Sequence, residues 1–194
     1  MSVGPKRAYH HGDLREALIE QAVASVDAVG ADHVSLRAVA AAVGVSPSAA
    51  YHHFADKDEL MEAVRTRGFT QLDDFILCQV DVDSAPTGPL ELMRHSANSY
   101  ICFAVDHPHL FQVMFNGQIA PPRPEYIEGS VVSVLGDLQA DYGFAAEDAH
   151  LLETVLIAAV HGIATLVNEG RMNRSLVPSA VDMLTTIILQ SPKR

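Results

Sequence analysis

Residues 35–57 read SLRAVAAAVGVSPSAAYHHFADK, and this stretch predicts a short helix, a glycine turn and a second short helix. Apolar residues recur at the i, i+3, i+4 and i+7 positions of the first helix, which Ser35 can cap at its N-terminus. Gly44 supplies the left-handed backbone that ends this helix. Ser46 and Pro47 then signal the start of the second helix only about two residues later. Such a short connection makes the helices cross steeply, which is typical of a DNA-reading helix-turn-helix.

Further helices are predicted on both sides of this motif. Asp13 and Glu16 form an Asp-x-x-Glu capping box, and the apolar residues that follow keep helical spacing until Gly30. Asp56 and Glu59 form a second capping box, which opens a longer helix that leads into the rest of the chain. The pattern predicts an all-α fold, in which a three-helix head is followed by a linking fourth helix.

The sequence VSPSAAYHHFADKDEL at residues 45–60 resembles the signature of the tetracycline-repressor (TetR) family. In that signature a short recognition helix ends in Tyr-x-x-Phe, and a lysine opens the next helix. The resemblance implies a homodimeric transcription regulator, most often a repressor, whose C-terminal domain binds a small molecule and controls the spacing of two DNA-binding heads. We therefore expect a helix-turn-helix domain at residues 1–55, with an N-terminal arm at 1–11. A helical effector-binding and dimerisation domain would follow at 56–194.

A second resemblance concerns the C-terminal half of the chain. Residues 106–115, which read DHPHLFQVMF, and the later run Val160-His161-Gly162 are similar to TetR C-terminal domains marked by Trp-His-Gly. This chain has Val160 where the tryptophan of that subclass would stand.

Candidate DNA contacts gather around the second helix of the motif. The TetR resemblance assigns Tyr51, His52 and Lys57 to the phosphate backbone, and residues 47–49 to the base edges. A lysine at a helix N-terminus also favours an anion through the helix dipole. Arg37 could reach a phosphate or be solvated, and the basic N-terminal arm could enter the minor groove or be a disordered terminus. The predicted DNA-binding residues are Lys6, Arg7, Arg37, Ser46, Pro47, Ser48, Ala49, Tyr51, His52 and Lys57.

The charge balance limits how the chain can bind operator DNA. The formal net charge is −11, and residues 1–67 contain seven Lys and Arg against nine Asp and Glu. The remaining residues contain six against fifteen. We expect modest and strongly salt-dependent non-specific affinity, so recognition of double-stranded operator DNA must depend on a few placed side chains.

Helices are predicted at about residues 147–168 and 178–190, and both have broad apolar faces. These faces exceed what one small domain needs. Two such helices from each subunit would form a four-helix bundle, which predicts a homodimer. The predicted interface residues are Leu152, Leu156, Ala159, Val181, Leu184 and Ile188.

The aromatic residues between positions 100 and 126 predict a pocket for an apolar or amphipathic small-molecule effector. A histidine inside an apolar helix is the preferred polar group of this pocket. A ligand held there could swing the fourth helix as a lever. The predicted effector contacts are Phe103, Phe111, Met114 and His161.

Other functions have weaker support in the sequence. The C-terminal histidines, His95, His107, His109, His150 and His161, make a metal-sensing regulator of the same fold the alternative, but no CxxC or HExxH spacing occurs. We therefore expect no metal and no other cofactor. A helical enzyme or protein-interaction domain is the alternative from a different class, although no GxGxxG, GxxxxGK[ST] or GxSxG motif is found.

The chain shows no pattern typical of a membrane or secreted protein. No window of about 18 uncharged apolar residues occurs, and no apolar segment follows Lys6 and Arg7 as in a signal peptide. These patterns predict a cytoplasmic protein that does not bind membranes.

Overall fold

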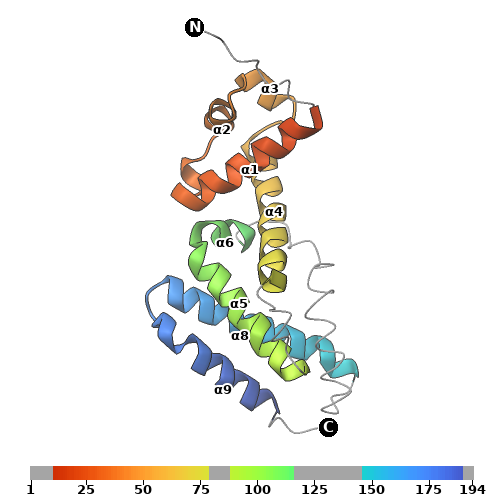
Figure 1. The fold of residues 1–194 in the computed structure, drawn as a ribbon, viewed down its shortest axis with the longest axis vertical. Helices are drawn as coiled ribbons and strands as arrows, with labels where there is room; N and C mark the ends of the chain where they lie inside the picture. The colour runs from red at the N-terminus through yellow and green to blue at the C-terminus, as the bar shows by residue number, and fades with distance from the viewer. Residues whose placement is uncertain (1–10, 79–87, 116–145, 190–194) are drawn as a thin grey trace.

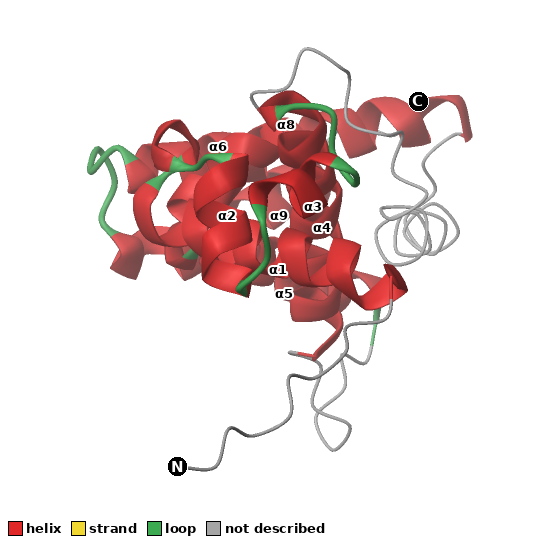
Figure 2. Cartoon of the chain, turned by 90° about the horizontal axis from the view of Figure 1, so that it is seen from above, coloured by secondary structure: helices red, strands yellow, loops and turns green. Residues whose placement is uncertain are grey.

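The computed structural model of the protein describes residues 11–78, 88–115 and 146–189, and all regular structure within these ranges is helical. The elements are α1 (His11–Val29), η1 (Ala31–His33), α2 (Leu36–Val43), α3 (Pro47–Tyr51), α4 (Lys57–Cys78), α5 (Pro89–Asp106), α6 (Pro108–Phe115), α8 (Ala146–Asn168), η3 (Arg174–Leu176) and α9 (Val177–Leu189). Figure 1 shows α2 and α3 at one end of an elongated molecule, and α5, α8 and α9 at the other. Figure 2 shows the same helices from above.

The helix-turn-helix follows the signals in its sequence. The Ser35 hydroxyl accepts a hydrogen bond from the Ala38 amide at 3.2 Å and caps α2. Gly44 has a φ of 84° and ends α2 in the left-handed conformation. The Ser46 hydroxyl caps α3 by accepting from the Ala49 amide at 3.2 Å. The predicted helix, glycine turn and helix are confirmed.

The start of α4 uses the predicted capping pair in a modified form. The Glu59 amide donates to Oδ1 of Asp56 at 2.9 Å, as a capping box requires. The Glu59 carboxylate, however, accepts from the Ala55 amide at 2.6 Å, one residue before the cap. The loop that leaves α3 is therefore fixed to the first turn of α4.

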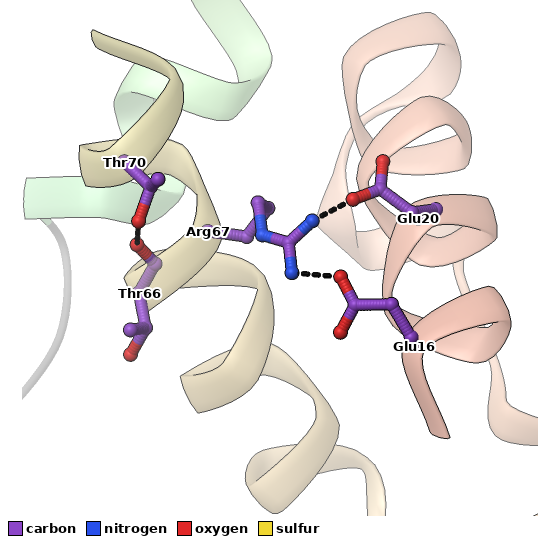
Figure 3. Close-up of polar contacts among 5 residues, drawn as sticks. All are labelled: Glu16, Glu20, Thr66, Arg67 and Thr70. Carbon is purple, nitrogen blue, oxygen red and sulfur yellow. Dashed lines mark hydrogen bonds and ion pairs between the residues drawn. The ribbon is translucent and has the colours of Figure 1, made fainter. Parts of the chain in front are cut away.

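Arg67 connects α4 to α1. Its guanidinium lies between the carboxylates of Glu16 and Glu20 and pairs with both (Figure 3). Each glutamate is half-exposed, and exposed ion pairs contribute only about 0–1 kcal/mol. We infer that the pairing of Arg67 with the two glutamates fixes the register of α1 on α4, whereas burial of apolar side chains supplies most of the stability.

The described residues form two apolar clusters in the core, and α6 contributes to both. The first joins α1 to α4 with α6 and the end of α5, and it includes the buried Leu18 and Phe54. The second joins α5, α6, α8 and α9 around Ile101. Met114 belongs to the first cluster and Phe111 to the second. The short helix α6 therefore links the head to the C-terminal helices.

The contact between α4 and α6 is unusually close at Gly68. A Cβ atom at this position would lie 2.7 Å from Cγ of Met114 and 3.3 Å from Cδ1 of Leu110. A glycine is thus needed for this helix approach rather than for its backbone freedom. None of the described helices combines the length and apolar character needed to cross a membrane.

Candidate nucleic-acid interface and ligand pocket

The polar face of α3 is exposed at the end of the molecule farthest from α8 and α9 (Figure 1). Ala50 and Phe54 are fully buried beneath it and attach α3 to the core. Ala49 is half-buried, which leaves less of its side chain for a base edge than the sequence predicts. Lys6 and Arg7 lie outside the described residues. The exposed residues among the predicted DNA contacts are Arg37, Ser46, Pro47, Ser48, Tyr51 and His52.

Lys57 has a structural role that the sequence did not predict. Its Nζ atom donates to the Ala31 carbonyl at 2.8 Å and joins the start of α4 to η1. An ammonium group has three donors, so this bond is compatible with a phosphate contact through the others. Arg15 also makes a contact in the head that the sequence did not predict. Its guanidinium lies over the Phe54 ring, 5.1 Å from the ring centre.

The structure separates the four residues predicted to contact an effector. Phe111 and His161 come together as a stacked pair, with ring centres 5.1 Å apart and an interplanar angle of 28°. Phe103 instead packs on Phe75 within the first core cluster, and Met114 packs on α4. Both are almost completely buried, and neither is among the described residues that line the pocket between α6 and α8, so this pocket does not support the prediction for these two side chains.

A pocket of about 440 Å³ lies between α6 and α8. Two phenylalanines form its apolar wall, and histidine, hydroxyl, amide and carboxylate groups provide its polar part. No Lys or Arg is among the described residues that line it. The lining residues are Pro108, His109, Phe111, Gln112, Phe115, His161, Thr165, Asn168 and Glu169.

Tyr100 supports His161 from α5. The Tyr100 hydroxyl lies 3.1 Å from Nδ1 of His161. Burial raises the pKa of the Tyr100 phenol, which therefore stays protonated. Burial also lowers the pKa of His161, whose ring stays neutral at pH 7. The two residues are 61 positions apart in sequence, so only the fold reveals this pair.

Two histidines join the head to the segment where α5 ends and α6 begins. Nδ1 of His107, the residue that ends α5, donates to Oδ2 of Asp27 on α1 at 2.8 Å. Nδ1 of His109 donates to the Asp27 carbonyl at 3.0 Å. Beside these bonds, His109 and Gln112 also line a hollow of about 400 Å³ against the end of α1 and η1.

These contacts bear on the metal-sensing alternative. His107, His109 and His161 are engaged with protein groups, and Nε2 of His95 lies 3.4 Å from the Ile76 carbonyl. In the described part of the chain, no three His, Cys, Asp or Glu side chains lie close enough together to hold a metal ion. The side chain of His150 lies outside what the structure describes. The described residues therefore offer no support for a metal site.

The exposed apolar residues of α8 and α9 differ from those predicted to form the dimer interface. Leu156 and Val181 are buried in the core of their own subunit, with 6% and 0% exposure, so they are not available to a partner. Their burial within the single subunit does not favour the prediction that they form a dimer interface. Leu152, Ala159 and Leu184 are half-buried, and the Ile188 side chain lies outside the described residues. The large apolar side chains exposed on the two helices include Leu151, Val155, Met183 and Ile187.

Comparison with known proteins identifies the family of this fold. Residues 18–64 match the family described as bacterial regulatory proteins, tetR family. Residues 93–190, half of the chain, match the family described as tetracyclin repressor-like, C-terminal domain. The chain belongs to the TetR family. TetR-family proteins are helix-turn-helix transcriptional regulators and not enzymes, which sets aside the enzymatic alternative.

Individual relatives match most of the chain. The uncharacterized HTH-type transcriptional regulator YobS of Bacillus subtilis is 23% identical over 84% of this chain and 83% of its own length. The uncharacterized HTH-type regulator Rv0681 of Mycobacterium tuberculosis is 27% identical over 82% and 72%. A solved structure of a protein of unknown function from Rhodococcus sp. RHA1 is 28% identical, with a TM-score of 0.76 and coverage of 97% of this chain and 100% of that one.

The two TetR matches separate the candidate interface from the pocket. Helix α3 lies in the N-terminal match, which ends inside α4. The pocket between α6 and α8 lies in the C-terminal match. The polar surface that suits DNA and the hollow that suits a small molecule are therefore on different parts of one TetR chain.

Proposed function

We propose that this TetR-family regulator is a ligand-responsive repressor that binds a pseudo-palindromic operator as a homodimer. The position of α6 is the observation that carries the ligand response. On one side α6 lines the 440 Å³ pocket against α8, and on the other it packs on α1 and α4, which carry the head. Residues 1–55 would bind DNA, and residues 56–194 would bind the effector and form the dimer.

The coupling between pocket and head would pass through α6. His109 and Gln112 line both the ligand pocket and the hollow beside α1. A molecule that fills the first space must change the packing of α6 and with it the contacts to Asp27 and Gly68. Dimer heads must lie about 34–36 Å apart to read successive major grooves. A ligand favours release of the operator only if it binds more tightly to a dimer whose heads do not have this spacing.

The second copy of the chain would occupy the exposed apolar surface of α8 and α9. Leu151 and Val155 are one helical turn apart on α8, and Met183 and Ile187 are one turn apart on α9. Each of the four side chains is about half or more exposed in the single subunit. Two such helix pairs would form a four-helix bundle across a two-fold axis.

We also propose that the C-terminal domain is of the Trp-His-Gly subtype, with Val160 in place of the tryptophan. The support is His161, which is held by Tyr100 and lines the pocket. As a DNA-binding regulator, the protein would work in the cytoplasm.

The proposed function is tested by selecting operator DNA with the full chain. Randomised duplexes should yield a two-fold symmetric site with half-site centres about 10 base pairs apart, or a multiple of that spacing. A promoter that carries this site should be silenced by the protein in a transcription assay. Selection without any sequence preference would overturn the proposal, and activation of the promoter would overturn the repressor assignment.

A further inference from the structure

We infer that the pocket between α6 and α8 takes a neutral, planar molecule whose hydrogen-bond acceptor binds the Nε2–H group of His161. The inference rests on the proposed function for the biological use of this site. It goes beyond that function by naming the chemistry of the ligand. A ketone, an amide or an aromatic ring nitrogen carries a suitable acceptor.

The hydrogen bond to Tyr100 decides which nitrogen of His161 carries the proton. If Nδ1 carried it, the half-buried Tyr100 hydroxyl would accept from Nδ1 and would leave its own proton without an acceptor among the described residues. Within the described residues, His161 is the only hydrogen-bond partner of this hydroxyl. The phenol therefore donates to Nδ1, and the neutral ring carries its proton on Nε2.

Aromatic rings on α6 enclose His161 and give the pocket a flat apolar wall. Phe111 stacks on the imidazole, and Phe115 meets it edge-on with ring centres 4.6 Å apart. The two phenylalanine rings also contact each other at 4.8 Å, and both line the pocket. Ring faces of this kind favour offset stacking with a planar ligand.

The charges around the pocket favour a neutral ligand. Glu169 at the rim carries a half-exposed carboxylate, which would repel an anion, although Arg171 pairs with it at 3.2 Å. Neither Lys nor Arg is found among the described lining residues. A cation placed over the phenylalanines would face the N–H donor of His161, so the donor also disfavours positive charge.

Nitrogen NMR of the full chain tests the tautomer without any ligand. Protein labelled with ¹⁵N-histidine should show one ring at pH 7 with a protonated Nε2 and an unprotonated Nδ1. This ring is assigned to His161 by its absence from the spectrum of His161→Gln. A proton on Nδ1, or on both nitrogens, would overturn the inference.

Four benzene derivatives of similar size test the ligand class: acetophenone, isopropylbenzene, benzoate and benzylamine. One hydrogen bond gives about a 2- to 10-fold gain in affinity, so acetophenone should bind that much more tightly than isopropylbenzene. Benzoate and benzylamine should bind more weakly than acetophenone. Tighter binding of either ion, or no binding of any probe, would overturn the inference.

Variants connect this preference to the histidine. His161→Leu should remove the preference for acetophenone, whereas His161→Gln keeps a side-chain donor and should retain part of it. His95→Leu makes the same change outside the pocket and should leave the preference intact. A preference that survives in His161→Leu would overturn the inference. Operator binding is measured in parallel, because its absence in the wild-type protein would count against the proposed function instead.

Discussion

At the scale of single residues, Lys57 has a structural contact and a predicted DNA contact. Its ammonium group donates to the Ala31 carbonyl, and its position at the N-terminus of α4 suits a phosphate. If it contacts a phosphate, Lys57→Met should reduce the magnitude of the slope of log affinity against log salt by about 0.9 per subunit, or about 1.8 for the proposed dimer. The measurement is operator affinity across a series of KCl concentrations. Arg171→Met removes an exposed cation beside the distant pocket and should leave the slope unchanged. An unchanged slope together with reduced stability in Lys57→Met would leave only the structural role.

Asp73 on α4 makes the stability of the fold depend on pH. Burial, followed by repulsion from Asp74, raises its pKa from 3.8 to about 6. The folded state thus holds this proton more tightly than the unfolded chain, so stability falls as pH rises from about 4 to 6. Asp73→Asn should raise the free energy of unfolding at pH 7 by about 1 kcal/mol, a value reduced for solvent screening of this half-buried group.

Urea unfolding at several pH values checks this prediction. The gain in the free energy of unfolding of Asp73→Asn should shrink toward zero below pH 4, where Asp73 is protonated and both side chains are neutral. Asp74→Asn removes the repulsion but not the burial, so it should give a smaller gain. A gain in Asp73→Asn that is constant from pH 3 to 8 would contradict the assigned pKa.

At the scale of helices, the close approach of α4 and α6 at Gly68 predicts a change of sign between two backgrounds. Gly68→Ala places a Cβ atom 2.7 Å from Met114 and should destabilise the protein by about 1–2 kcal/mol, despite the better helix propensity of alanine. In Met114→Ala the two nearest atoms are absent and only Cδ1 of Leu110 at 3.3 Å remains, so the same change should be neutral or stabilise by up to about 1 kcal/mol. Equal effects in the two backgrounds, measured by urea unfolding, would show that α6 does not press on Gly68.

The helix scale also shows what the sequence could predict. Ser35, Gly44 and Ser46 act on backbone groups within three or four residues, so their roles follow from local chemistry and were confirmed. The aromatic side chains of α5 and α6 could not be sorted in this way. Phe103 and Phe111 are equally apolar in the sequence and both are buried, and only the positions of α4 and α8 decide that Phe103 joins the first cluster, whereas Phe111 joins the second and also lines a pocket.

The same limit applies to α8, whose apolar face is broader than one neighbour requires. Val155 and Leu156 are adjacent, yet the first is 49% exposed and the second 6%. Periodicity shows that both are apolar but not which of them is buried within its own subunit. The Tyr100–His161 hydrogen bond was equally out of reach, because no local pattern pairs residues of different helices.

At the scale of the whole molecule, the exposed stripe on α8 and α9 predicts the dimer. The double variant Val155→Glu and Ile187→Glu places two charges in the proposed interface and should give monomers in sedimentation experiments. These monomers should keep the helical content of the wild type but lose binding to a two-half-site operator. Leu77→Glu changes an equally exposed residue on α4 and should remain dimeric. Undiminished dimers of the double variant would place the interface elsewhere.

A hybrid regulator joins the head of one protein to the effector-binding half of another. Such a hybrid must preserve the apolar core that spans the boundary between the two parts. Leu18 and Phe54 from the head share one apolar cluster with Leu60 on α4 and Leu110 on α6. A cut after residue 55 would divide this cluster and expose apolar surface on both fragments. Exchange of residues 11–78 as a unit keeps α1 to α4 intact, and the surface that receives α6 and the end of α5 then needs to be matched to its new partner.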